Sequence, residues 1–399
     1  MRRVLGVRRD YAWGSPSAIH ELMGTEPDGR PLAELWFGAH PSGPAVAEDG
    51  AGDVRGLIES DPAGTLGRDV LARFGAQLPY LLKLIAPRRP LSLQVHPDLE
   101  RARARFAAEN RAGVPLDAPW RNYRDPNHKP ELVFALTTFE AVSGFRAPRR
   151  AAELLADLDA PLTRALHAAL LTDPTPGGMR TAFTSLLDPA TRPSAPEVAD
   201  VVDACRRRAA DGSPSPRADA IVGRLAEEHP HDPGVVASLL LNPVTLQPGD
   251  SLFVPAGGVH AYLSGIGVEV MASSDNVLRA GLTSKHVDVG EVLDCVDYVA
   301  APPIRVAPEV FHGATRVFYA PVDDFELSVT TLADGDCADG ARPLPGRGPR
   351  MLVCIEGEVE VAAASGGLPL RRGQAAFVRA DDGPLTVRGA GTLVQADVP

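Results

Sequence analysis

The chain has 399 residues, of which 44% are hydrophobic and 23% are charged, the balance of a globular protein with an ample core. Its 51 acidic and 40 basic side chains give a net charge of −11, which argues against nucleic-acid and anionic-membrane partners. No apolar run long enough to span a membrane is present, the N-terminal segment lacks the apolar stretch of a secretory signal, and the four cysteines form no CxxC pair. We therefore expect a cytoplasmic protein without a disulfide framework or a thiolate metal site.

The first 148 residues consist of short apolar runs separated by Gly, Pro, Asn and Asp, a pattern typical of strands in a sandwich or barrel. The clearest predicted strands span residues 32–37, 81–85, 91–95 and 132–136.

The pattern changes over residues 149–241, where leucines recur every three or four residues and Pro-rich breaks separate further helical runs. These runs span residues 197–210, 218–228 and 234–241. We expect a helical insertion here.

Strand-like patterns return at residue 242 and continue to the end of the chain. In the tail, residues 351–355 and 358–362 read as two strands with a turn at Gly357. The predicted architecture is mainly β, in three parts: a β body of residues 1–148 and 242–315, a helical insertion of residues 149–241, and a second β module of residues 316–399.

Three short segments place chemically active side chains two residues apart, the spacing that puts them on one face of a strand. The pairs are Gln94 with His96, Lys129 with Glu131, and His260 with Tyr262. If the three strands line one barrel, an amide oxygen, two imidazoles and a carboxylate converge on one point. Such mixed donors suit zinc, with manganese, iron or cobalt as alternatives. A histidine taken alone is better explained as a core or loop residue, whereas the set taken together favours a metal site.

A loop centred on residues 264–267 predicts a hairpin in which Tyr262 faces Glu269 and His260 faces Met271. This hairpin brings Glu269 within reach of the metal region. The alternative is a surface glutamate on an edge strand.

Arginine outnumbers lysine by 37 to three in this chain. The lysines that remain, Lys83, Lys129 and Lys285, mark positions where a compact ammonium is needed, unless each was retained by chance.

Several stretches carry a family resemblance. Gly249, Pro255, Gly257 and His260 resemble the second metal-binding motif of the cupin superfamily. Residues 123–131 (YRDPNHKPE) and residues 260–285 resemble the two signatures of type I mannose-6-phosphate isomerases. Support comes from residues 11–15, 33–36, 38–41 and 90–98, with Lys83 ahead of the last stretch. One departure is Ser284, where the family usually has proline.

The resemblance implies a zinc-dependent aldose–ketose isomerase, with one zinc ion per chain, that interconverts mannose 6-phosphate and fructose 6-phosphate through an enediol. It implies a cupin-type jelly-roll barrel that carries the metal site, and a second, cupin-like module in the tail. That module is expected to bind no metal, because Pro384 stands where His260 stands in the first motif. Carried over by position, the metal ligands are Gln94, His96, Glu131 and His260, and Arg279 is the essential active-site arginine.

The chemistry of isomerisation suggests further roles. A general base is required near the substrate carbons, for which Glu269 is the first candidate and Lys129 the second. Tyr262 and His128 are candidates for ring opening or proton shuttling. The phosphate requires a local cationic pocket inside an acidic protein, and we assign Lys83, Ser92 and Lys285 to it.

Two other functions fit the same motifs. A cupin dioxygenase would present similar ligands to Fe(II) but would not need the cationic group. A non-catalytic sugar-binding or storage cupin would keep the barrel but would not need all four ligands, and all four are present. We expect a monomer with a sugar phosphate as its small-molecule substrate.

Overall fold

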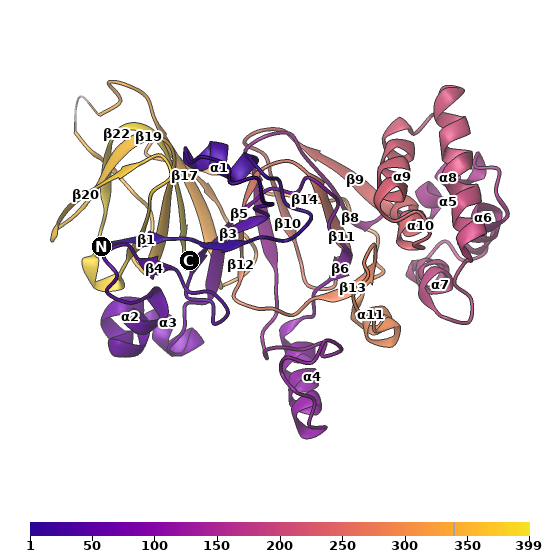
Figure 1. Cartoon of the computed structure of the whole chain (residues 1–399), viewed down its shortest axis with the longest axis horizontal. Coiled ribbons are helices and arrows are strands. Elements are labelled where there is room, and N and C mark those ends of the chain that lie inside the picture. Colours follow the sequence, from indigo (N-terminus) through magenta and orange to yellow (C-terminus); the bar gives the residue numbers. More distant parts are fainter. Residues whose placement is uncertain (338–339) are drawn as a thin grey trace.

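Three antiparallel sheets and a separate group of helices make up the computed structural model, which describes residues 1–337 and 340–399 (Figure 1). The helices are α1 (Ala18–Met23), α2 (Val54–Ser60), α3 (Pro62–Phe74), α4 (Leu99–Arg111), α5 (Pro148–Ala156), α6 (Pro161–Thr172), α7 (Pro176–Leu187), α8 (Ala195–Ala210), α9 (Pro216–Glu228), α10 (Gly234–Ala237) and α11 (Val289–Cys295). None of the described helices combines the length and apolar character needed to cross a bilayer.

Two of the sheets face each other. The seven-stranded sheet contains β2 (Val7–Arg9), β3 (Glu34–Gly38), β5 (Tyr80–Ile85), β7 (Glu131–Ala135), β10 (Ser251–Val254), β12 (Gly267–Ala272) and β14 (Ile304–Arg305). The five-stranded sheet contains β6 (Leu93–Val95), β8 (Phe139–Phe145), β9 (Leu241–Leu246), β11 (His260–Ser264) and β13 (Leu278–Gly281). Side chains from both sheets, such as Val133 and Phe139, form one shared core.

The third sheet has ten strands and packs against the far face of the seven-stranded sheet. Its strands are β1 (Arg2–Leu5), β4 (Val46–Ala47), β15 (Glu309–Phe311), β16 (Thr315–Phe318), β17 (Glu326–Leu332), β18 (Arg342–Pro343), β19 (Arg350–Ala363), β20 (Gly366–Arg371), β21 (Ala375–Val378) and β22 (Thr386–Asp397). The N-terminal strand β1 pairs with β21, so both ends of the chain contribute to this sheet.

The seven-stranded sheet is therefore covered on both faces, which explains why its strands read as unbroken apolar runs. Leu82 and Leu84 of β5 point to the ten-stranded sheet, whereas Lys83 between them points to the five-stranded sheet. The same alternation in β12 turns Val268 and Val270 outward and Glu269 inward. In both strands, the side chains on one face pack in the hydrophobic core against the ten-stranded sheet. The opposite face carries the polar residues described below.

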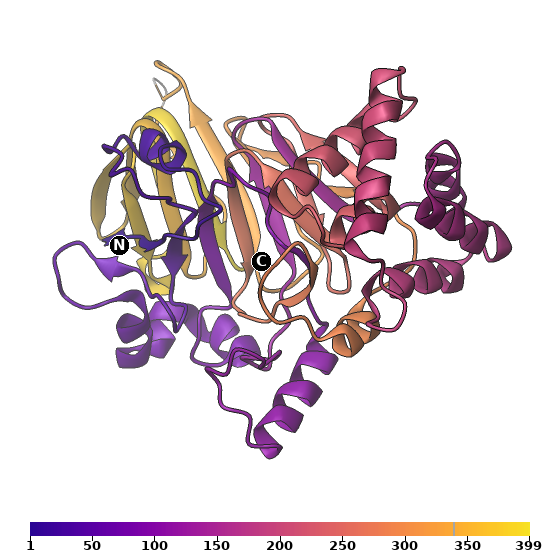
Figure 2. The ribbon, with the colours of Figure 1, turned by 45° about the vertical axis from the view of Figure 1, so that its right-hand side comes forward.

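The predicted helices are present. Helices α5 to α10 follow each other between β8 and β9 and share an apolar core with the outer face of the five-stranded sheet. They lie at the end of the molecule opposite the ten-stranded sheet, and α4 projects from the side of the body (Figures 1 and 2).

Two local predictions are wrong. Strands β11 and β12 do not form a hairpin, because β11 pairs with β6 and β8 whereas β12 pairs with β5 and β7. The chain crosses from one sheet to the other at residues 265–266. Nor does Gly357 end a strand: β19 is continuous over 14 residues, and Gly357, at φ 69°, follows a bulge that bends it.

Two buried carboxylates lie directly opposite each other in the ten-stranded sheet. Glu326 of β17 is in register with Asp397 of β22, and the two residues are 7% and 0% exposed. Burial and the charge of Glu326 raise the pKa of Asp397 well above its usual range, although Gln395 donates a hydrogen bond to it at 2.8 Å.

Asp397→Asn is expected to stabilise the protein more at pH 8 than at pH 5. The folded state holds a proton on Asp397 that the unfolded state releases above pH ~4, so this site makes folding less favourable as the pH rises. Urea unfolding of the parent protein and of Asp397→Asn between pH 5 and pH 8 measures the difference in their free energies of unfolding. An equal change in unfolding free energy at both pH values would contradict it.

Candidate active site and metal centre

Four of the residues singled out in the sequence converge between the two facing sheets. His96 directly follows β6, Glu131 begins β7, and His260 begins β11. The Nε2 atoms of His96 and His260 each lie 3.3 Å from a different oxygen of Glu131. The Gln94 amide lies 3.3 Å from Nε2 of His260. Ligand atoms of the two histidines and Glu131 all lie within 4.8 Å of one another.

Both histidine rings are held so that Nε2 faces this centre. Nδ1 of His96 lies 2.7 Å from the carbonyl oxygen of Asn276, and Nδ1 of His260 lies 3.0 Å from that of Gly258. Because a carbonyl only accepts, each Nδ1 carries a proton, and the Nε2 atom of each ring faces the centre. Metal-binding histidines usually donate their other ring N–H to a partner of this kind, which fixes the orientation of the ring.

The donor set fits a divalent metal ion. Nε2 of His96 is buried without a hydrogen-bond partner among the described residues, although buried polar atoms are normally paired. Two imidazoles, a carboxylate and an amide match the preferences of zinc. Within the described part of the chain, no other group of three His, Cys, Asp or Glu side chains has this geometry.

Electrostatics keep these groups ready to bind a cation. Burial, together with the charge of Lys129, lowers the pKa of His96 to about 4, so the ring is neutral near pH 7. Burial disfavours the charge on Glu131, but Lys129 and His96 hold its pKa well below the usual range. Lys129 donates to Glu131 at 2.6 Å.

A second group of polar side chains lies on the inner face of the seven-stranded sheet. Lys83 of β5 is in register with Glu269 of β12 and donates to it at 3.0 Å, with Glu34 at 3.8 Å on its other side. Burial opposes the charge on Lys83, but these two carboxylates hold its pKa above the usual range. Lys83 is therefore a neutralised lysine inside the sheet pair, not a free cation.

Glu269 is buried and does not lie on an edge strand, which is contrary to the alternative of a surface glutamate. It is 2% exposed in β12, which has a neighbour on each side. Burial raises its pKa although Lys83 acts in the opposite direction. The Tyr262 hydroxyl lies 3.5 Å from Glu131, and burial followed by the charge of Glu269 raises its pKa well above the usual range. Tyr262 and Glu269 thus meet across the two sheets, not within a hairpin.

A group of cations lies beside this centre. Arg279 of β13 is in register with Gln94, and no described residue forms a hydrogen bond or ion pair with its guanidinium. Burial and the charge of Arg124 lower the pKa of Arg279. Lys285 is exposed, and burial of its stem with repulsion from Arg279 and Arg124 lowers its pKa. Ser92 is half-buried just before β6, and its hydroxyl has no partner among the described residues.

Comparison with known proteins identifies the family. A family model described as phosphomannose isomerase type I, catalytic domain, matches residues 1–148. The mannose-6-phosphate isomerase of Escherichia coli K12 is 39% identical over 400 residues, which cover 99% of each chain. The chain belongs to the type I phosphomannose isomerases. As a member of this family it is an isomerase.

More distant relatives and solved structures agree with this membership. Mannose-6-phosphate isomerase 1 of Arabidopsis thaliana is 32% identical and covers 96% of this chain and 90% of its own length. The Salmonella typhimurium mannose-6-phosphate isomerase, solved with fructose 6-phosphate and zinc, superposes with a TM-score of 0.88 at 37% identity, covering 100% of this chain and 99% of the other.

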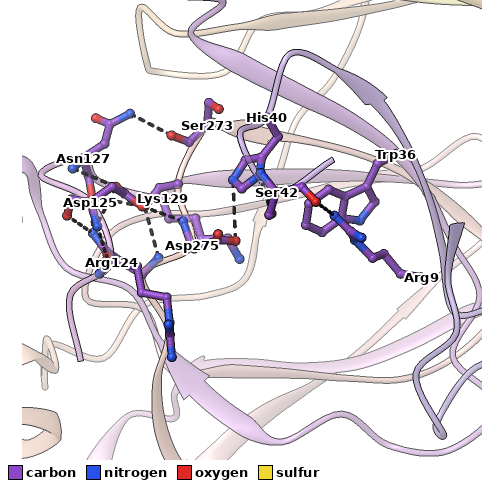
Figure 3. Close-up of polar contacts among 12 residues, drawn as sticks. Arg9, Trp36, His40, Ser42, Arg124, Asp125, Asn127, Lys129, Ser273 and Asp275 are labelled. Carbon is purple, nitrogen blue, oxygen red and sulfur yellow. Dashed lines mark hydrogen bonds and ion pairs between the residues drawn. The ribbon is translucent and has the colours of Figure 1, made fainter. Parts of the chain in front are cut away.

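The structure of this phosphomannose isomerase family member adds residues that the sequence patterns did not single out. His40 is 4% exposed and lies beside Trp36, and its Nε2 is 3.5 Å from Asp275 (Figure 3). The backbone N–H of Ser42 donates to Nδ1 of His40, so Nε2 carries the proton and points to Asp275. Arg124 was also missed. Residues 36–40 and 275 fall inside the family-like stretches, which was the signal that could have found them.

Proposed function

We propose that this chain interconverts mannose 6-phosphate and fructose 6-phosphate through an enediol, and that it requires one zinc ion per chain. The observation that carries the proposal is the buried meeting point of His96, Glu131 and His260, with Gln94 beside it, in a chain that aligns over its full length with mannose-6-phosphate isomerases.

The arrangement of the sheets and helices supports a division of the chain into three parts. We infer that the two facing sheets form a cupin-type jelly-roll barrel, drawn from residues 1–148 and 242–315, with residues 149–241 as a helical insertion. Residues 316–399 would form a second, cupin-like module without a metal. Strands β1, β4 and β15 lie outside residues 316–399 but also pair in this module's sheet, so they tie it to the barrel.

A bound zinc ion would supply a Lewis acid that polarises the sugar's oxygen atoms without a change in redox state. Gln94, His96, Glu131 and His260 would hold it, and they bring a single negative charge from Glu131. Lys129 compensates that charge, which leaves the centre positive overall and suited to a developing enediolate.

In the open-chain aldose, a base removes the proton from C2 and returns it to C1. Glu269 is suited to this role because burial raises its pKa toward the working range, while Lys83 keeps the carboxylate oriented. Tyr262 keeps its proton and lies between Glu131 and Glu269, so it is placed to move a proton between the substrate hydroxyls. Lys129 is the alternative base.

Arg279 is placed to stabilise the negative charge that develops on the substrate oxygens. Its register with Gln94 puts it next to the metal ligands, and its charge has no partner among the described side chains that a substrate would have to displace. The phosphate would then lie toward Lys285 and Arg124, with Ser92 nearby in the segment that leads into β6. Lys83 would orient Glu269 rather than bind the phosphate, because its charge is already neutralised by Glu34 and Glu269.

Lys285→Ala is expected to raise KM for mannose 6-phosphate about tenfold and to change kcat little. An ammonium that binds a phosphate away from the reacting carbons contributes equally to the ground state and the transition state. Steady-state kinetics measure this, with His286→Ala as a neighbouring exposed control. An unchanged KM would remove Lys285 from the phosphate site.

The proposed function is tested by assaying the purified protein on mannose 6-phosphate with coupled detection of fructose 6-phosphate, and by elemental analysis of the same sample. We expect turnover, one equivalent of zinc, loss of turnover on chelation and recovery on adding zinc. Turnover that survives complete metal removal would reject the metal role. Bound iron with oxygen consumption and no isomerisation would favour the dioxygenase instead.

A further inference from the structure

The loop that leads into Glu131 contacts a residue nearly 200 positions further along the chain. Nε2 of His128 lies 2.9 Å from Oδ2 of Asp324, which precedes β17 in the ten-stranded sheet. Asp324 is 4% exposed, and His128 is its only hydrogen-bond or ion-pair partner among the described side chains. A carboxylate at this depth is costly without a partner, so the contact constrains both residues.

The opposite side of the same loop is attached to the segment after β12. The Asn276 side chain donates to the carbonyl oxygens of Asp125 and Asn127, both at 2.8 Å. Asn127 in turn donates to the carbonyl oxygen of Ser273 (Figure 3). Residues 125–128 are therefore held between residues 273–276 on one side and Asp324 on the other.

The next residue along the loop is part of the site. Lys129 is 7% exposed and donates to Glu131 at 2.6 Å, and Pro130 then restricts the backbone. A displacement of His128 is transmitted to Lys129 because one peptide unit separates them. Errors of about 1 Å in catalytic geometry cost up to about 100-fold in rate.

We propose that Asp324 is a positioning residue for the isomerisation, which acts through His128 to hold Lys129 in place. The C-terminal part of the chain is then needed for the geometry of the active site and not only for packing. Asp324 accepts from Nε2–H, which sets both the orientation and the tautomer of the His128 ring. This inference rests on the proposed function.

Asp324→Ala is expected to lower kcat about tenfold while KM changes less than about twofold and the zinc content stays at one equivalent. The control is Asp323→Ala, because the side chain of Asp323 is 87% exposed one position away, and it should stay within about twofold of the parent. In a His128→Ala background, Asp324→Ala should lower kcat less than about twofold further. An equal loss in both backgrounds would overturn the proposal, since Asp324 would then act independently of His128.

A measurement without turnover separates this proposal from the proposed function. In ¹⁵N-edited spectra of the imidazole nitrogens, the parent protein should show an Nε2–H of His128 that is protected from exchange with water, and Asp324→Ala should lose that protection while other histidine signals stay unchanged. An unchanged His128 signal would overturn the positioning role. If the parent protein fails to isomerise mannose 6-phosphate, the proposed function fails, and the spectra still report whether Asp324 orients His128.

Discussion

Replacing His260 by alanine is expected to remove both the bound metal and the turnover. The ring is fully buried, its Nδ1 proton is committed to the Gly258 carbonyl, and its Nε2 faces Glu131 at 3.3 Å. His96, Glu131 and His260 are the one group of three His, Cys, Asp or Glu side chains with this geometry among the described residues, and loss of even a supporting partner of a ligand costs about 10–100-fold in affinity. We expect the zinc affinity to fall at least about 100-fold and kcat to become undetectable.

Elemental analysis after dialysis, with competition against a chelator of known affinity, measures this effect. His231→Ala is the matched control, because His231 is exposed in the turn between α9 and α10 and forms no hydrogen bond or ion pair with the metal ligands. Circular dichroism should show that both variants fold. Full zinc occupancy in His260→Ala would withdraw His260 from the ligand set, whatever happens to the rate.

Arg279→Ala is expected to fold and bind zinc normally but to lose about 100- to 1,000-fold in kcat. Removing one preorganised donor to a developing oxyanion typically has an effect of this size. The substitution should cost little stability, because the guanidinium makes no hydrogen bond or ion pair with any described residue and burial lowers its pKa.

The comparison is made with Arg103→Ala, which removes an exposed arginine from α4 and should leave kcat unchanged. Arg279→Lys should recover only part of the rate, since an ammonium lacks the planar fork of donors. Wild-type turnover in Arg279→Ala would exclude it from the chemistry. A loss of zinc in this variant would instead assign it a structural role beside Gln94.

Several features of the site could be predicted from the sequence because they depend on local geometry. Residues two apart on a strand share a face, so spacing alone was enough to group Gln94 with His96 and Lys129 with Glu131. The predicted strands over residues 81–85 and 132–136 correspond to β5 and β7.

The predictions that depended on strand pairing were less successful. The segment after Tyr262 has the composition of a hairpin, yet β11 and β12 join different sheets. The choice depends on which neighbours bury each strand, and those neighbours come from elsewhere in the chain. Lys83 illustrates the consequence, because its ion pairs with Glu269 and Glu34 follow from the order of strands in the sheet and not from its place in the sequence.

The donors, their spacing along each strand and the family can all be read from the order of the amino acids. The packing of the folded chain alone decides which cationic side chains have no carboxylate partner. Arg279 and Lys285 have no carboxylate partner among the described residues, whereas Lys83 and Lys129 do. The physical reason is that alternation along a strand is set by the bond geometry of neighbouring residues, while the neutralisation of a charge depends on side chains brought within a few ångströms from distant parts of the chain.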